Sequence, residues 1–98
     1  MNTYNSDPVA LTQDLIRFNT INPPGNEDEI CGFLEKLLLS AGFECKFVDF
    51  APRRRSLVAR IVGAQGGPNI CFTGHVDVVP LGGRPWQYEP FAAEIHDG

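Results

Sequence analysis

The stretch Cys71–Pro80, CFTGHVDVVP, decides how the rest of the chain is interpreted. The apolar run Ile70–Phe72 predicts a short buried strand, and Gly74 frees the backbone where a loop begins. Residues i and i+2 of an extended segment point to the same side, so the imidazole of His75 and the carboxylate of Asp77 should face one space. Because sites on α/β sheets lie at strand ends, the sequence predicts a functional site here.

Two amphipathic helices are predicted before this strand. Asp7 followed by Pro8 is typical of a helix start, and this helix should run to about residue 19 from its apolar spacing. Asn26 and Glu29 have the spacing of a capping box for a second helix, which Gly42 should end. The apolar positions of the second helix are Ile30, Phe33, Leu34, Leu37, Leu38 and Ala41. Each helix therefore has one face to bury.

A hairpin is predicted after the second helix. Apolar and charged residues alternate from Phe43 to Phe47, which indicates a strand with one buried face. Leu57–Val62 predicts a second strand, and Ala51–Ser56 is too short for a crossover, so the two strands should be antiparallel. The sequence thus predicts an α/β fold with helices packed on a mixed β-sheet.

The end of the sequence is typical of an interrupted hairpin. Ala92–His96 predicts a short strand, and Asp97-Gly98 is a common tight-turn dipeptide. No partner strand follows. We therefore expect residues 1–98 to form a single partial domain, truncated within a hairpin at Gly98, with a thin core.

Composition and charge exclude several classes of function. The net charge of -4 and the pI of about 4.9 give no basic field for nucleic acid. The cationic run Arg53–Arg55 is interpreted as a solvated turn, with a phosphate patch as the alternative. No stretch is long and apolar enough to span a membrane, and residues 1–7 do not have the pattern of an export signal. We therefore expect a cytoplasmic protein without membrane or nucleic-acid partners.

The three cysteines, Cys31, Cys45 and Cys71, are odd in number and widely spaced. No C-x-x-C pair or zinc-finger spacing is present. They are expected to be reduced core residues.

Several polar and aromatic groups have simple structural interpretations. The acidic run Glu27–Glu29 lies where a helix dipole favours negative charge, which explains it better than a catalytic carboxylate pair. His96 should be a surface residue, and Trp86 and Phe91 should pack a loop. A lone H-x-D pair is also more often structural than metal-binding. The buried strand, Gly74 and the rigid exit towards Pro80 favour the functional interpretation.

Taken as a set, these motifs resemble the M20 family of zinc-dependent amidohydrolases and peptidases, which includes acetylornithine deacetylase and succinyl-diaminopimelate desuccinylase. The matching residues are Gly74–Pro80, Trp86, Pro90-Phe91 and Asp97-Gly98, with Ile21–Glu27 and Ala41–Phe43 upstream. The resemblance spans nearly the whole chain.

The resemblance implies a zinc site of which this chain holds a part. His75 would be a ligand of one zinc, and Asp77, assigned to the catalytic set, would orient the His75 ring and tune the metal. A complete site in the family holds two zinc ions, and its other ligands and its general base are absent here. A catalytic zinc site normally has three protein ligands, so the isolated chain is expected to bind zinc weakly and to be inactive.

Two functions remain open from the sequence. The first is zinc-dependent hydrolysis of the amide bond of an N-acyl amino acid or peptide by a parent enzyme whose second domain lies outside this chain. The alternative is a non-catalytic binding or self-associating module, since an unpaired sheet edge favours homo-oligomers.

Overall fold

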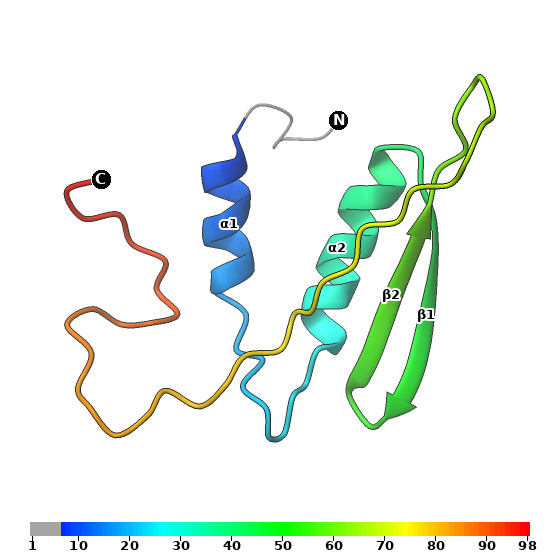
Figure 1. Cartoon of the computed structure of the whole chain (residues 1–98). Coiled ribbons are helices and arrows are strands. Elements are labelled where there is room, and N and C mark those ends of the chain that lie inside the picture. The colour runs from blue at the N-terminus through cyan, green and yellow to red at the C-terminus, as the bar shows by residue number, and fades with distance from the viewer. Residues whose placement is uncertain (1–6) are drawn as a thin grey trace.

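The computed structural model describes residues 7–98. It contains the helices α1 (Pro8–Ile16) and α2 (Asp28–Ser40) and the strands β1 (Glu44–Ala51) and β2 (Arg54–Arg60). α2 packs on the β1–β2 hairpin, and α1 lies on the other side of α2 (Figure 1). This is a small α/β arrangement, as expected. The prediction about an export signal concerns mainly residues 1–6, which lie outside the described part.

The start of α1 is the predicted one. Asp7 Oδ1 accepts a hydrogen bond of 2.9 Å from the backbone amide of Ala10, and Pro8 occupies the first helical position. The helix ends at Ile16, earlier than expected. Beyond it the chain turns so that the ring of Phe18 contacts that of Phe33 in α2, with centroids 5.5 Å apart.

The end of α2 is predicted correctly and its start is not. The amide of Phe43 donates to Leu38 O and the amide of Gly42 to Leu39 O, both at 3.0 Å, with Gly42 at φ +93°. This is the Schellman arrangement that a glycine permits. At the other end the expected capping box is absent, because Asn26 has φ +46° and the helix starts at Asp28.

The predicted antiparallel hairpin is present. Phe47 is paired with Leu57, and a bulge interrupts the register between Asp49 and Ala51. The half-buried side of β1 carries Cys45 and Phe47, which follows the alternation in the sequence. β2 begins earlier than predicted, so the connection is shorter than the expected six-residue segment.

The arginine run is not the solvated turn that the sequence predicted. Arg54 and Arg55 belong to β2, and their side chains are only 26% and 31% exposed. The Arg55 guanidinium lies 4.3 Å from the centroid of the Phe47 ring and 2.9 Å from Asp49 Oδ1. Only Arg53, at φ +57° with its side chain 53% exposed, is a turn residue. Pairing of these arginines within the fold also disfavours the phosphate-patch alternative.

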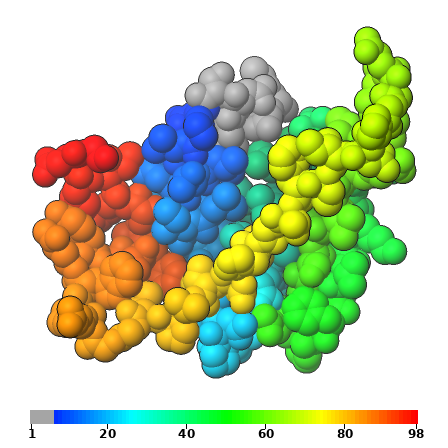
Figure 2. Space-filling model, viewed as in Figure 1, coloured from blue at the N-terminus to red at the C-terminus, as the bar shows by residue number. Residues whose placement is uncertain are grey.

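Residues 61–98 form neither a helix nor a strand (Figure 1). The predicted strands Ile70–Phe72 and Ala92–His96 are therefore wrong for this structure, and the described sheet has two strands rather than a mixed set. Ile70 and Phe72 are 81% and 90% exposed, and Figure 2 shows this yellow segment on the outside of the molecule. A strand needs a neighbouring backbone to pair with, and the described residues provide none there.

The core is thin. Its buried apolar residues are Ile30, Cys31 and Ala93, and Thr20 and Glu27 are buried polar residues. The radius of gyration is 15.8 Å, wider than the ~13 Å of a compact domain of about this length. Of the three free cysteines, Cys31 is buried as expected and Cys45 partly so, whereas Cys71 is exposed and is not a core residue. No helix within residues 7–98 has the length and apolar character needed to cross a membrane.

Candidate functional site

The candidate site is built where the connection after α1 meets the segment that carries His75. The amide of Asn22 donates to Val78 O at 2.8 Å, and the amide of Val78 donates to Thr20 O at 3.1 Å, which forms a short parallel bridge. The Thr20 hydroxyl, buried at 2% exposure, adds a bond of 2.6 Å to Val76 O. The bridge fixes the backbone on both sides of Asp77.

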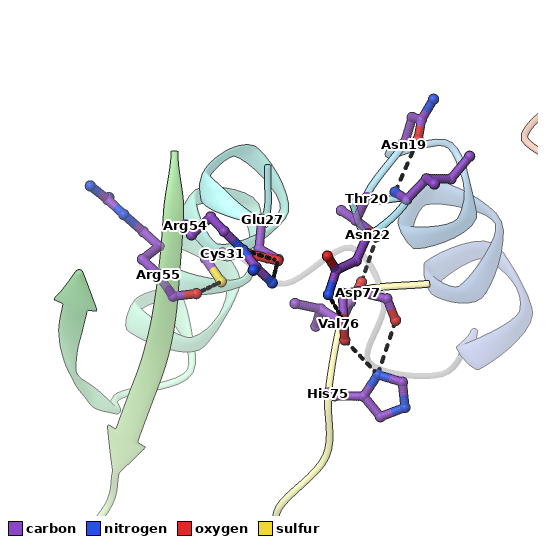
Figure 3. Close-up of polar contacts among 11 residues, drawn as sticks. Asn19, Thr20, Asn22, Glu27, Cys31, Arg54, Arg55, His75, Val76 and Asp77 are labelled. Carbon is purple, nitrogen blue, oxygen red and sulfur yellow. Dashed lines mark hydrogen bonds and ion pairs between the residues drawn. The ribbon is translucent and has the colours of Figure 1, made fainter. Parts of the chain in front are cut away.

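His75 and Asp77 meet as their spacing predicts. His75 Nδ1 lies 2.9 Å from Asp77 Oδ1 and 2.9 Å from the backbone oxygen of Asp77 (Figure 3). A backbone carbonyl can only accept, so Nδ1 must carry the proton. In the neutral ring the lone pair then belongs to Nε2, on a side chain that is 82% exposed. This is the tautomer in which Nε2 can bind a metal.

The second oxygen of Asp77 is held by a residue that the sequence analysis did not single out. Asn22 Nδ2 donates to Asp77 Oδ2 at 3.0 Å. The hydrogen bond from Asn22, followed by that from His75, lowers the pKa of Asp77 below its usual value. Both carboxylate oxygens are thus engaged within the chain, which suits Asp77 for orienting the ring rather than for binding a metal directly.

A buried ion pair lies next to this group. The carboxylate of Glu27, which is 3% exposed, accepts three hydrogen bonds from the Arg54 guanidinium, and Figure 3 shows this pair between the hairpin and Asn22. Hydrogen bonding to Glu27 raises the pKa of Arg54, and the charge of Asp77 adds to the effect. The acidic run therefore does more than complement the helix dipole, because Glu27 at the start of α2 binds Arg54 of β2.

The sequence analysis missed Thr20, Asn22 and Arg54 at this site. It interpreted the segment around Asn22 as a turn, because the following prolines and glycine are typical of one. A polar side chain directly before a Pro-Pro pair gives no sign of its distant partner. The match of Ile21–Glu27 to the family's opening residues was the one available signal.

The remaining candidates lie apart from this group in their contacts. His96 is exposed, its Nε2 lies 2.9 Å from Glu94 Oε2, and its ring stacks on that of Tyr88 with centroids 3.7 Å apart. Trp86 Nε1 donates to Leu81 O at 3.0 Å. His96 is a surface residue, as expected. Trp86 is bonded within its loop but is 58% exposed, so it packs the loop only in part.

The residues present fit one ligand position of a zinc site and no more. His75 offers an exposed Nε2 backed by a carboxylate, which is the usual arrangement of a zinc-binding histidine. Among residues 7–98 no group of three or more His, Cys, Asp or Glu side chains is placed to hold a metal ion. A catalytic zinc normally has three protein ligands, so the described residues do not make a complete catalytic site.

Comparison with known proteins gives the context of this pair. The chain is 42% identical over 93 residues to a succinyl-diaminopimelate desuccinylase of Wolbachia pipientis from Culex pipiens. The chain is homologous to these desuccinylases. It is also 40% identical over 96 residues to the desuccinylase of Granulibacter bethesdensis and 41% identical over 95 residues to that of Ehrlichia ruminantium. These matches confirm the resemblance to M20 enzymes that the motifs indicated.

The desuccinylase matches cover most of this chain and a small part of each relative. They include 94%, 95% and 93% of the chain but only 22%, 24% and 24% of the three relatives, in the same order. No family model matches the chain, and no solved structure matches it.

Proposed function

We propose that this chain supplies one zinc ligand, His75, and its orienting carboxylate, Asp77, to an amide hydrolase that removes the succinyl group from N-succinyl-diaminopimelate or a closely related N-acyl amino acid. The observation that carries the proposal is the pair itself: Nδ1 is held by Asp77 and Nε2 is exposed. The homology to succinyl-diaminopimelate desuccinylases supports the choice of substrate.

The residues of this chain have defined tasks in that reaction. Zinc, when bound, supplies Lewis-acid activation of a water molecule and of the amide carbonyl. Asp77 keeps the proton on Nδ1 of His75, so the lone pair of Nε2 stays available as a ligand. The bridge between Ile21 and Val78 holds the backbone that carries the pair.

The proposal includes the surroundings of the pair. We place the chain as part of a larger α/β/α catalytic domain in which a mixed sheet extends the β1–β2 hairpin, with two zinc ions at the complete site and a second domain elsewhere in the parent protein. The parent would act in the cytoplasm on a small soluble substrate in amino-acid biosynthesis. The exposed Ile70 and Phe72 support this view, since further chain would cover them.

A chimera tests the enzymatic function. The matched segment of the Wolbachia desuccinylase is replaced by the corresponding residues of this chain, and release of succinate from N-succinyl-diaminopimelate is measured with zinc present. We expect turnover that is lost in the His75→Ala chimera and kept in a His96→Ala chimera. A folded chimera that binds zinc normally and hydrolyses the substrate equally well without His75 would refute the assignment. An intact mass of the native gene product well above 10.8 kDa would show that these residues belong to a longer protein.

The exposed apolar surface favours one second candidate, a self-associating module. Val62, Ile70 and Phe72 are between 71% and 90% exposed, and exposed apolar residues of this kind favour association. A native product near 10.8 kDa that elutes as an oligomer would support this function. A monomeric elution profile would exclude it.

A further inference from the structure

Asn22 is bonded to the candidate site at two points, once through its side chain and once through its backbone. Its amide nitrogen Nδ2 donates to Asp77 Oδ2 at 3.0 Å, and its backbone amide donates to Val78 O at 2.8 Å. One residue on the α1–α2 connection therefore contacts two consecutive residues that lie 55 and 56 positions away along the sequence. Neither contact is needed to close the local turn that the sequence predicted.

We propose that Asn22 is a positioning residue, which fixes the plane of the Asp77 carboxylate so that His75 keeps its proton on Nδ1 and presents Nε2 outward. The functional importance of this placement rests on the proposed zinc-ligand role of His75. The placement itself is a property of the metal-free chain and can be tested without zinc or substrate.

The pair of His75 and Asp77 needs such a support because it lies near the surface. The side chains of His75 and Asp77 are 82% and 32% exposed, and water competes for hydrogen bonds between exposed side chains. The terminal torsion of an aspartate is broad, so one hydrogen bond from His75 does not fix the carboxylate plane. The second bond, from Asn22 to Oδ2, removes this freedom.

The chemistry of the asparagine amide suits this task. Both oxygens of an ionised carboxylate only accept hydrogen bonds, and the NH₂ group of Asn22 can donate without carrying charge. An aspartate in its place would have nearly the same shape but no donor, and it would repel Asp77. The Asn22→Asp variant therefore separates the donated bond from the packing of the side chain.

The tautomer of His75 is the readout. ¹⁵N chemical shifts of the imidazole are measured in the ¹⁵N-labelled, metal-free chain at a pH at which the ring is neutral. Four chains are compared: the parent sequence, Asn22→Ala, Asn22→Asp and the matched control Asn19→Ala. Asn19 Oδ1 accepts from the Ile21 amide at 3.1 Å on the same connection but has no bond to Asp77. Hydrogen exchange of the Asn22 and Val78 amides reports the backbone bridge in each chain.

We expect the parent chain and Asn19→Ala to hold His75 mainly as the Nδ1–H form. In both Asn22 variants the share of the Nδ1–H form should fall towards that of free histidine while the bridge amides stay protected, because the bond from Nδ1 to Asp77 O then acts without a fixed carboxylate beside it. Two results would overturn the proposal. One is an unchanged Nδ1–H form in the Asn22 variants. The other is loss of amide protection in both variants, which would assign Asn22 to the bridge alone. Failure of the chimera to hydrolyse substrate would not change either result.

Discussion

The carboxylate of Glu27 lies buried against the guanidinium of Arg54, which donates three hydrogen bonds of between 2.7 and 3.1 Å to it. The pair joins the start of α2 to the start of β2. The same guanidinium lies 5.1 Å from the centroid of the Phe50 ring. Because few apolar residues are buried around it, we expect this ion pair to contribute strongly to the packing of the hairpin on α2.

Removal of Arg54 alone should destabilise the chain strongly, because it leaves a buried carboxylate without its partner. We expect Arg54→Met to lower the urea midpoint clearly more than the control Arg53→Met does, because the Arg53 side chain is half exposed. The double variant Glu27→Gln with Arg54→Met should recover part of the loss. Urea unfolding followed by circular dichroism measures all of these. A double variant less stable than Arg54→Met would contradict this account.

The ion pair between Glu27 and Arg54 leaves room only for a glycine at position 25. The φ of Gly25 is +99°, and a Cβ atom there would lie 2.5 Å from both Arg54 Nε and Glu27 Oε1. The left-handed backbone alone costs an alanine about 1–2 kcal/mol. Gly66→Ala is the matched control, with φ +67° and nothing within 4 Å of the added Cβ. We expect Gly25→Ala to lower the free energy of unfolding by more than Gly66→Ala. Equal losses would show that Gly25 is needed only for its backbone angle.

The sequence was sufficient for elements set by local chemistry. Asp7 caps the start of α1 through its carboxylate, and Gly42 ends α2 because glycine tolerates a positive φ. The alternation of polar and apolar residues identified the hairpin. It was insufficient where the outcome depends on a distant partner. Ile70–Phe72 has the composition of a buried strand, yet no described backbone pairs with it. Asn22 and Arg54 gain their roles only when folding brings them to their distant partners, Asp77 and Glu27.

The ion pair between Asp28 and Arg53 should give the chain a pH-dependent part of its stability. The hydrogen bond from Arg53, at 3.2 Å, lowers the pKa of Asp28 below the usual value of an aspartate. A group whose folded pKa is depressed stabilises the fold above its unfolded pKa and loses that effect as the pH falls through the folded pKa. The stability difference between the parent chain and Arg53→Met should therefore be constant above about pH 5 and shrink as the pH falls below about 4, near the unfolded Asp value.

Urea midpoints of the unsubstituted chain and of Arg53→Met, measured between pH 2.5 and pH 7, test this dependence. Arg17→Met serves as the control, because Arg17 is paired with Asp14 on the exposed side of α1. A difference that grows on acidification would contradict the assigned ion pair.

Asp77 should set the zinc affinity of the proposed active site. Loss of a carboxylate that orients a ligating histidine typically lowers metal affinity by about 10–100-fold. We expect this loss for Asp77→Asn in the chimera with the Wolbachia desuccinylase, measured by competition with a chromogenic chelator. Asp49→Asn is the control, since Asp49 pairs with Arg55 on the hairpin. Equal zinc affinity of the Asp77→Asn chimera and the parent chimera would remove Asp77 from the metal site.

The three cysteines should react in the order of their exposure. Cys71 is exposed, Cys45 is half-buried and Cys31 is buried. Burial also raises the pKa of the Cys31 thiol, and the nearby charge of Glu27 adds to this. Because the thiolate is the reactive form, Cys31 is protected both sterically and chemically. Alkylation with iodoacetamide at neutral pH, followed by mass spectrometry, should modify Cys71 first and Cys31 last. In urea the three rates should converge. Early modification of Cys31 in the folded chain would show that α2 and the hairpin separate readily. In that case the ion pair between Glu27 and Arg54 would be too weak to hold them together.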